Sequence, residues 1–126
     1  METKNICGIR RIYKAINSFE KRLEDSMGLN LNEAMLLCLL SDDTTLTAGE
    51  IAEAMQLTRS NTSKVISSLE RRHYLRRRVC KNDNRSMCFH LTKAGSEMLG
   101  HLHCDSLQLP DDLKPLQSLS DDGPLG

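Results

Sequence analysis

The chain opens with an apolar stripe that repeats every three to four residues. Its members are Ile6, Ile9, Ile12, Tyr13, Ile16, Phe19, Leu23 and Met27, with charged residues between them. This spacing predicts one apolar face on a helix of about five to six turns, which Gly28 ends. An apolar stripe of this length must pack against something. The periodicity favours equally two ways of packing, on the protein's own core or on a partner chain.

The next segment, Leu31–Leu40, is apolar on most sides. Asn30 and Glu33 have the spacing of a capping box at its start. We therefore expect this helix to be the most buried element. A polar turn at 41–43 follows, and residues 44–46 are β-prone, enough for a very short strand.

Two capped helices follow in close succession. Thr47 and Glu50 form a second capping-box pattern, for a helix that runs to about Met55. Thr58 is placed to cap another helix, Arg59–Arg72, after a connection of about three residues. Two short helices joined this tightly cross steeply, which is helix-turn-helix geometry.

The second of these helices has two contrasting faces. Its inward face is predicted to be Thr62, Val65, Ile66 and Leu69. Its outward polar residues are Arg59, Ser60, Asn61, Ser63, Lys64, Ser67 and Arg71. A solvated helix face usually pairs acids with bases. Short hydrogen-bonding side chains and cations without acids suit base edges and phosphates, so we predict that this face contacts DNA.

A basic hairpin comes next. Residues 75–80 and 86–91 flank KNDNR, whose Asn-Asp-Asn content marks a turn. In the second strand Met87, Phe89 and Leu91 alternate with Cys88 and His90, as in a half-buried strand. The hairpin's predicted DNA contacts are Arg76, Arg77, Arg78, Lys81, Asp83 and Arg85. Arginines also protect exposed edge strands, but their place after a helix-turn-helix favours phosphates or the minor groove.

The expected fold class is mainly α with a small β-wing: a winged helix-turn-helix with helical dimerisation elements at both ends. Residues 1–29 form the N-terminal supporting and dimerisation helix, and 30–91 the DNA-binding domain. Thr92 caps the C-terminal helical region, 92–119, also assigned to dimerisation. A short helix is expected around 111–119 although Pro115 lies inside it. Residues 120–126 are expected to be disordered.

The formal net charge of zero argues against a nucleic-acid partner, but the charges are segregated. Residues 59–85 hold nine Lys/Arg and two acids, a local +7, whereas residues 97–126 hold six acids and one lysine, a local −5. Such segregation produces a cationic surface that the net charge of the whole chain conceals.

At 126 residues the chain is long enough for one core. No apolar run reaches the roughly 18 residues that span a bilayer, and the charged N-terminus lacks a signal-peptide pattern, so we expect a soluble cytoplasmic protein without membrane contact. The five cysteines, Cys7, Cys38, Cys80, Cys88 and Cys104, are odd in number and show no CxxC spacing. Reduced thiols, and no disulfide framework, are therefore expected.

Two segments resemble the MarR family of winged helix-turn-helix regulators: LERRHYLRR at Leu69–Arg77 and DNRSMCFHLTKAG at Asp83–Gly95. The resemblance covers roughly residues 28–99. The family's Leu-Glu-x-Arg-x-Leu, Asp-x-Arg and Leu-Thr-x-x-Gly patterns correspond to Leu69, Glu70, Arg72 and Tyr74, to Asp83 and Arg85, and to Leu91, Thr92 and Gly95. Together these motifs are specific; any one alone is weak.

The resemblance implies a homodimer on a pseudo-palindromic double-stranded DNA operator, most often a repressor released by a small-molecule effector or by oxidation. It assigns minor-groove entry to Arg85, oriented by Asp83. The sequence departs from the family at His73, where glycine is common, and at Arg76, often acidic or neutral. Its C-terminal region is also shorter than a full pair of dimer helices.

The sequence also bears on other classes of function. The acidic tail permits a winged-helix protein-interaction module without DNA binding, although such a module has little use for the wing arginines. The sequence contains no nucleophile elbow, phosphate loop or pair of acids that would indicate an enzyme. No cofactor is expected, and no metal either, since His101 and Cys104 lack a strong third ligand. Redox sensing is a further hypothesis, with Cys7, Cys80 and Cys88 as candidates, although most such cysteines are inert.

Overall fold

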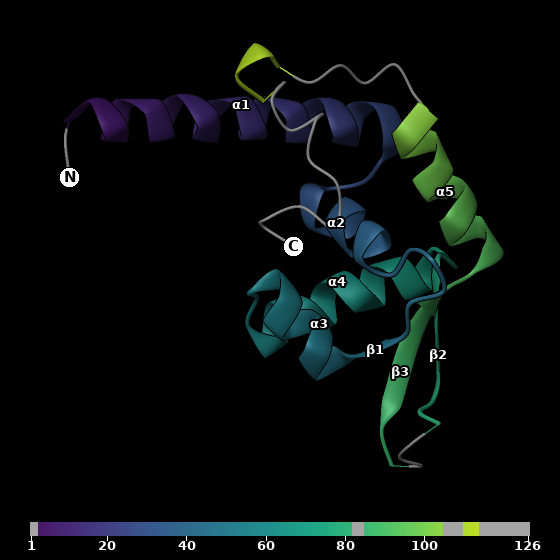
Figure 1. Ribbon diagram of the computed structural model, residues 1–126. Helices are drawn as coiled ribbons and strands as arrows, with labels where there is room; N and C mark the ends of the chain where they lie inside the picture. Colours follow the sequence, from purple (N-terminus) through teal and green to yellow (C-terminus); the bar gives the residue numbers. More distant parts are fainter. Residues whose placement is uncertain (1–2, 82–84, 105–109, 114–126) are drawn as a thin grey trace. The chain divides into compact units, whose positions relative to one another are not determined.

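The computed structural model describes residues 3–81, 85–104 and 110–113. Backbone contacts divide the chain into two units, residues 1–30 with 106–126, and residues 31–105. The elements are α1 (Thr3–Met27), α2 (Leu31–Leu39), β1 (Leu46–Thr47), α3 (Ala48–Met55), α4 (Arg59–Arg71), β2 (Leu75–Val79), β3 (Met87–Leu91) and α5 (Lys93–Cys104) (Figure 1). Mostly helical with a small antiparallel sheet, this architecture confirms the predicted fold class.

The first unit consists of α1 and a short C-terminal turn. The helix ends where predicted, because Gly28 adopts a left-handed φ of 69°. Part of the stripe is buried, as Leu23 shows, but Ile9 and Tyr13 are 56% and 65% exposed. The N-terminal half of the stripe therefore stays largely exposed, and no described residue buries it.

The described part of the C-terminal segment contributes one 3₁₀ turn at 111–113. Leu113 is buried there, and Asp112 accepts a hydrogen bond from Arg11 at 2.8 Å, an exposed ion pair worth little stability. The remainder of the predicted helix at 111–119, and the tail 120–126 predicted to be disordered, lie outside the described residues. No helix in the described ranges is long and apolar enough to cross a membrane.

The second unit contains the predicted helix-turn-helix. The Thr47 hydroxyl accepts from the Glu50 amide at 3.1 Å and the Glu50 carboxylate accepts from the Thr47 amide at 2.9 Å, which completes the capping box of α3. Gln56 ends α3 in a left-handed conformation, and Thr58 caps α4 by accepting from the Asn61 amide. Local capping chemistry therefore sets both helix boundaries.

The core of this unit lies where α4 packs against α2, α3 and β2. The predicted inward residues of α4, Thr62, Val65, Ile66 and Leu69, are all buried. The expectation for α2 was only partly right. Leu36 and Leu37 are fully buried, but Met35 is 43% exposed and Cys38 is also exposed, since neighbouring elements cover only one side of this short helix.

The three strands form an antiparallel sheet in the order β1-β3-β2. β3 therefore pairs on both edges: Phe89 lies opposite Leu46 and opposite Arg77. The simple alternation predicted for β3 was wrong, because Cys88 and Phe89 point to opposite faces and are both buried. A middle strand covered on both faces loses the alternation typical of a half-buried one.

A tight junction joins the end of α4 to the start of α5. His73 adopts φ 64° and Tyr74 N–H donates to Leu69 C=O at 2.9 Å, so a histidine occupies the left-handed position that favours glycine. The Thr92 hydroxyl donates to His73 C=O at 2.6 Å and accepts from Gly95 N–H at 3.0 Å. A Cβ on Gly95 would lie 2.2 Å from the Tyr74 carbonyl oxygen. The Thr-x-x-Gly motif therefore allows the two backbones to approach.

This close approach predicts that Gly95→Ala destabilises the protein by about 2 to 3 kcal/mol, because a backbone oxygen must move. Gly100→Ala in the same helix is the matched control, since a Cβ there meets nothing within 4 Å. The control should gain about 0.5–1 kcal/mol from helix propensity. Urea unfolding followed by circular dichroism measures both, and equal effects of the two substitutions would refute the close approach.

Candidate nucleic-acid interface

One face of α4 presents a polar surface without acids, which we call the recognition face. It consists of Arg59, Ser60, Asn61, Ser63, Lys64, Ser67 and Arg71, all exposed. Its central residues, Ser63, Lys64, Ser67 and Arg71, line a shallow open groove of about 330 Å³. These side chains are exposed because the opposite face of α4 is buried in the core. The structure thus brings together the α4 residues expected from the sequence.

The wing arginines separate onto two faces of β2. Arg76 and Arg78 pair with His90 and Cys88 and project from one face, whereas Arg77 lies opposite Phe89 on the other. Arg77 Nε and Nη2 donate to the Glu70 carboxylate at 2.9 and 2.8 Å, and its guanidinium lies 5.4 Å from the Phe89 ring centre. Arg77 therefore ties the wing to the end of α4, a role the sequence did not indicate.

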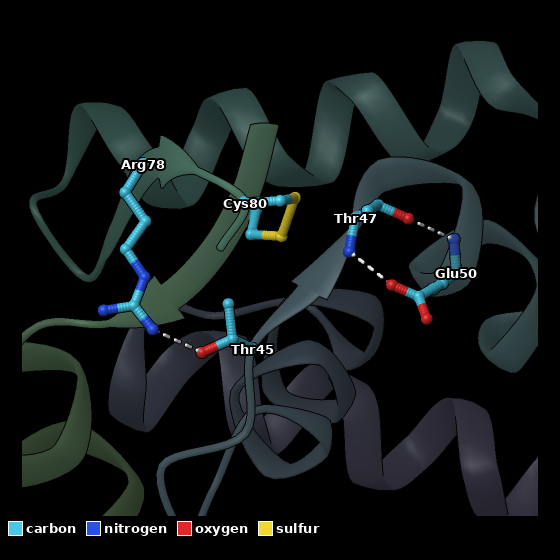
Figure 2. Close-up of a disulfide and its surroundings, with 6 residues drawn as sticks. Thr45, Thr47, Glu50, Arg78 and Cys80 are labelled. Atoms are coloured by element: carbon cyan, nitrogen blue, oxygen red, sulfur yellow. Dashed lines mark hydrogen bonds between the residues drawn. A yellow bond between two sulfur atoms is a disulfide. The ribbon is translucent and has the colours of Figure 1, made fainter. Parts of the chain in front are cut away.

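Arg78 joins the wing to the segment before α3. Its guanidinium donates to the Thr45 hydroxyl at 3.1 Å (Figure 2). Figure 2 also draws the capping box between Thr47 and Glu50, which begins two residues after Thr45. The side chain of Arg78 thus reaches across β3 toward β1, and it remains exposed.

The expectation of reduced thiols was wrong for two cysteines. Cys80 and Cys88 form a disulfide with their Cα atoms 5.3 Å apart. Cys88 lies opposite Arg78, two residues from Cys80, so the two cysteines are diagonal neighbours on the same face of adjacent strands. The pairing depends on strand register, which a search for CxxC spacing does not consider. Cys7 is an exposed thiol.

The tip of the wing is described in part. Lys81 and Arg85 are exposed on either side of the turn. Asp83, predicted to orient Arg85, lies outside the described residues. The cations that frame the tip extend the cationic surface of the wing beyond β2.

A buried carboxylate supports α4 from beneath and was not recognised as such in the sequence. Glu33 in α2 is 4% exposed and accepts a hydrogen bond from the Ser68 hydroxyl. Arg72 Nη1 lies 3.6 Å from the same carboxylate oxygen. A buried carboxylate is stable only with such partners. An acid inside an apolar helix was the available signal, although its capping-box spacing suggested a different role.

His90 lies in β3, opposite Arg76 of β2. Burial lowers the pKa of His90, and the positive charges of Arg78 and Arg76 lower it further. Its Nδ1 is buried and has no hydrogen-bond partner within the described part of the chain. Both effects favour the neutral imidazole.

Among the described residues, no group of three or more His, Cys, Asp or Glu side chains is arranged to hold a metal ion. His101 is exposed on α5, whereas the side chains of residues 103 and 104 lie outside the description. The polar groups gathered on α4 and the wing are mostly hydrogen-bond donors and cations, the kinds of side chain that contact phosphates and base edges.

The sequence model of the MarR family matches residues 29–87. The chain is also 29% identical over 87 residues to PapX, an HTH-type transcriptional regulator of Escherichia coli, an alignment that covers 68% of this chain. The chain spans about half of PapX, 53% of its length.

Solved structures share the fold. The transcriptional regulator BldR from Sulfolobus solfataricus superposes with a TM-score of 0.73 at 20% identity, covering 97% of this chain and 90% of BldR. MepR from S. aureus, in a complex with DNA, superposes with a TM-score of 0.62 at 20% identity, covering 87% of this chain and 85% of MepR. At these identities the likeness concerns the fold.

The lowered pKa of His90 predicts a pH-dependent stability. The unfolded chain takes up the proton near the ordinary pKa of 6.5, whereas the folded chain resists it, so the free energy of unfolding falls as pH drops below about 6.5. We expect wild type to lose more stability between pH 7.5 and pH 5.5 than His90→Gln, measured by urea unfolding. An equal loss in both proteins would show that His90 titrates as in the unfolded chain.

Proposed function

The chain carries a MarR-family winged helix-turn-helix at residues 29–87, and from this premise we propose that it is a sequence-specific, double-stranded DNA-binding transcriptional regulator. The observation that carries the proposal is the recognition face: exposed hydrogen-bonding and cationic side chains without a single acid, on a helix whose other face is fixed in the core. Such a helix can enter a major groove and present donors and acceptors to base edges.

Contacts to bases and contacts to phosphates have different tasks. Ser60, Asn61 and Ser63 lie near the start of α4 and are the candidates for reading bases. Lys64 and Arg71, farther along the same face, are suited to phosphates. The exposed wing cations, Arg76, Arg78, Lys81 and Arg85, extend this surface, with Arg85 the candidate for the minor groove. We leave Arg77 out of the proposed DNA contacts, because its Nε and Nη2 already donate to the Glu70 carboxylate.

We propose that the functional form is a homodimer. The uncovered part of the α1 stripe supports this, since Ile6, Ile9 and Ile12 are 54%, 56% and 47% exposed in the single chain. A second copy would bury these side chains and place two recognition helices about one helical turn of DNA apart, on a pseudo-palindromic operator. MepR was solved in complex with DNA, which is consistent with this use of the fold.

We further propose that the regulator is a repressor released by a small-molecule effector, and that it acts in the cytoplasm. Release by oxidation is the alternative, which a disulfide that restricts the wing disfavours. The charge distribution of the chain supports DNA as the partner, because the local +7 of residues 59–85 coincides with the recognition face and the wing. The acidic region at 97–126 lies outside that surface in sequence.

Selection of bound duplexes from random DNA tests this function directly. One enriched sequence should emerge, and its affinity should fall steeply between 50 and 200 mM salt, as expected when several phosphates are contacted, about 10³-fold for six contacts. Lys64→Ala should weaken binding to all sequences and lower the salt slope by about one. Ser63→Ala should instead change the preferred sequence. Recovery of no preferred sequence, with salt-independent binding, would refute the proposal.

Neighbouring arginines provide a second test with a built-in control. Arg77→Ala should lower stability by about 0.5–1 kcal/mol through loss of the pair with partly buried Glu70, and leave affinity nearly unchanged. Arg76→Ala should leave stability unchanged and reduce affinity by about 3- to 10-fold, with a smaller salt slope. Urea unfolding and fluorescence anisotropy measure the two effects. The reverse pattern would mean that Arg77, rather than Arg76, contacts DNA.

A further inference from the structure

The wing contains a covalent bond between its two strands, next to its cationic tip. We propose that Cys80 and Cys88 form a reversible thiol–disulfide site that controls the order of the wing and thereby the affinity for DNA. The consequence for affinity rests on the DNA-binding function proposed above, whereas the chemistry of the site does not. The substrate class is a low-molecular-weight disulfide in one direction and a low-molecular-weight thiol in the other.

The strand register allows the hairpin and the disulfide to exist together. Cys80 N–H donates to Ser86 C=O at 2.9 Å, so the ladder between the strands continues as far as Cys80 with the disulfide in place. The bond joins residues separated by 8 in sequence, and the covalent ring it closes contains Lys81 and Arg85. A cross-link restricts the conformations available to the chain inside it. The cations nearest the tip are therefore the ones that the bond constrains.

Access to the bond is asymmetric. Cys88 is 9% exposed, whereas Cys80 is partly exposed. Both line an open hollow of about 530 Å³ that lies between the wing, β1 and the start of α3. Arg78 and Lys81 also line it, together with the acids Asp43 and Glu50, of which Glu50 is engaged in the capping box (Figure 2). A small thiol or disulfide can thus enter the hollow and meet Cys80 first.

The chemistry is ordinary thiol–disulfide exchange. The Cys80 thiolate attacks one sulfur of a low-molecular-weight disulfide, forming a mixed disulfide and expelling one thiolate. The Cys88 thiolate then attacks the Cys80 sulfur, expelling the second thiolate and closing the protein disulfide. The protein loses two electrons and two protons, and the reagent becomes two thiols. Positive charge near Cys80, from Arg78 and Lys81, favours the attacking thiolate.

The conformational restriction of the wing tip determines whether oxidation raises or lowers the affinity for DNA. In the oxidised protein the conformational freedom around Lys81 and Arg85 is already restricted before DNA binds. In the reduced protein more of that freedom is lost on binding, and this loss weakens the affinity for DNA. The oxidised protein should therefore bind the same duplex about 3- to 10-fold more tightly.

The test uses the full chain, reduced with dithiothreitol or oxidised with glutathione disulfide, with the redox state verified by mass after thiol alkylation. One readout is hydrogen exchange at the Cys80 amide, which needs no DNA. The other is affinity for a duplex enriched from random DNA by both forms. Cys80→Ser with Cys88→Ser removes the pair. Cys7→Ser, Cys38→Ser and Cys104→Ser together form the matched control that retains it.

We expect slower Cys80 exchange and about 3- to 10-fold tighter binding on oxidation, in wild type and in the triple variant alike. The double variant should not respond and should match reduced wild type. Equal exchange and affinity in both redox states, or a response that survives in the double variant, would overturn the proposal. If no form selects DNA, the DNA-binding function fails, and the exchange measurement alone still decides whether the pair orders the wing.

Discussion

β3 holds the helix-turn-helix unit, residues 31–105, together, because its two edges pair with segments on either side of the helix-turn-helix. On one edge it pairs with β1, which leads directly into α3; on the other it pairs with β2, which follows α4 after the turn at His73. Two hydrogen-bonded ladders therefore fix both ends of the helix pair to one strand. The Glu70–Arg77 pair and the contact of Thr92 with His73 then fix the last turn of α4. A site that reads DNA needs this rigidity, since a loosely held recognition helix loses specificity.

The arrangement also determines which charges are available to a partner. Arg77 pairs with Glu70, and Arg72 lies near buried Glu33, so two arginines of the basic segment support α4 through contacts within the protein. Arg76 and Arg78 occupy the opposite face of β2 and remain exposed, as do Lys64 and Arg71 on α4. A count of positive charge along the sequence treats these residues as equivalent, whereas the structure assigns them different tasks.

Much of the fold follows from local patterns and could be predicted from the sequence. The caps at Thr47 and Thr58, the end of α1 at Gly28 and the buried face of α4 each depend on residues within a turn or two of one another. The disulfide between Cys80 and Cys88, the burial of Cys88 and the pairing of Arg77 depend on strand register and on contacts between elements, which periodicity does not specify. Glu33 shows the same limit, because its partner Ser68 is distant in sequence and only packing brings them together.

We propose that α4 and the wing together form the DNA-contacting surface. The most direct measurement is an NMR titration of the isotopically labelled full chain with a duplex enriched from random DNA, following the backbone amides. We expect the largest shifts at Ser60–Ser67 and at the exposed wing residues Arg76, Arg78, Lys81 and Arg85, with small shifts at the exposed residues of α2. Shifts concentrated on α2, with α4 and the wing unchanged, would contradict it.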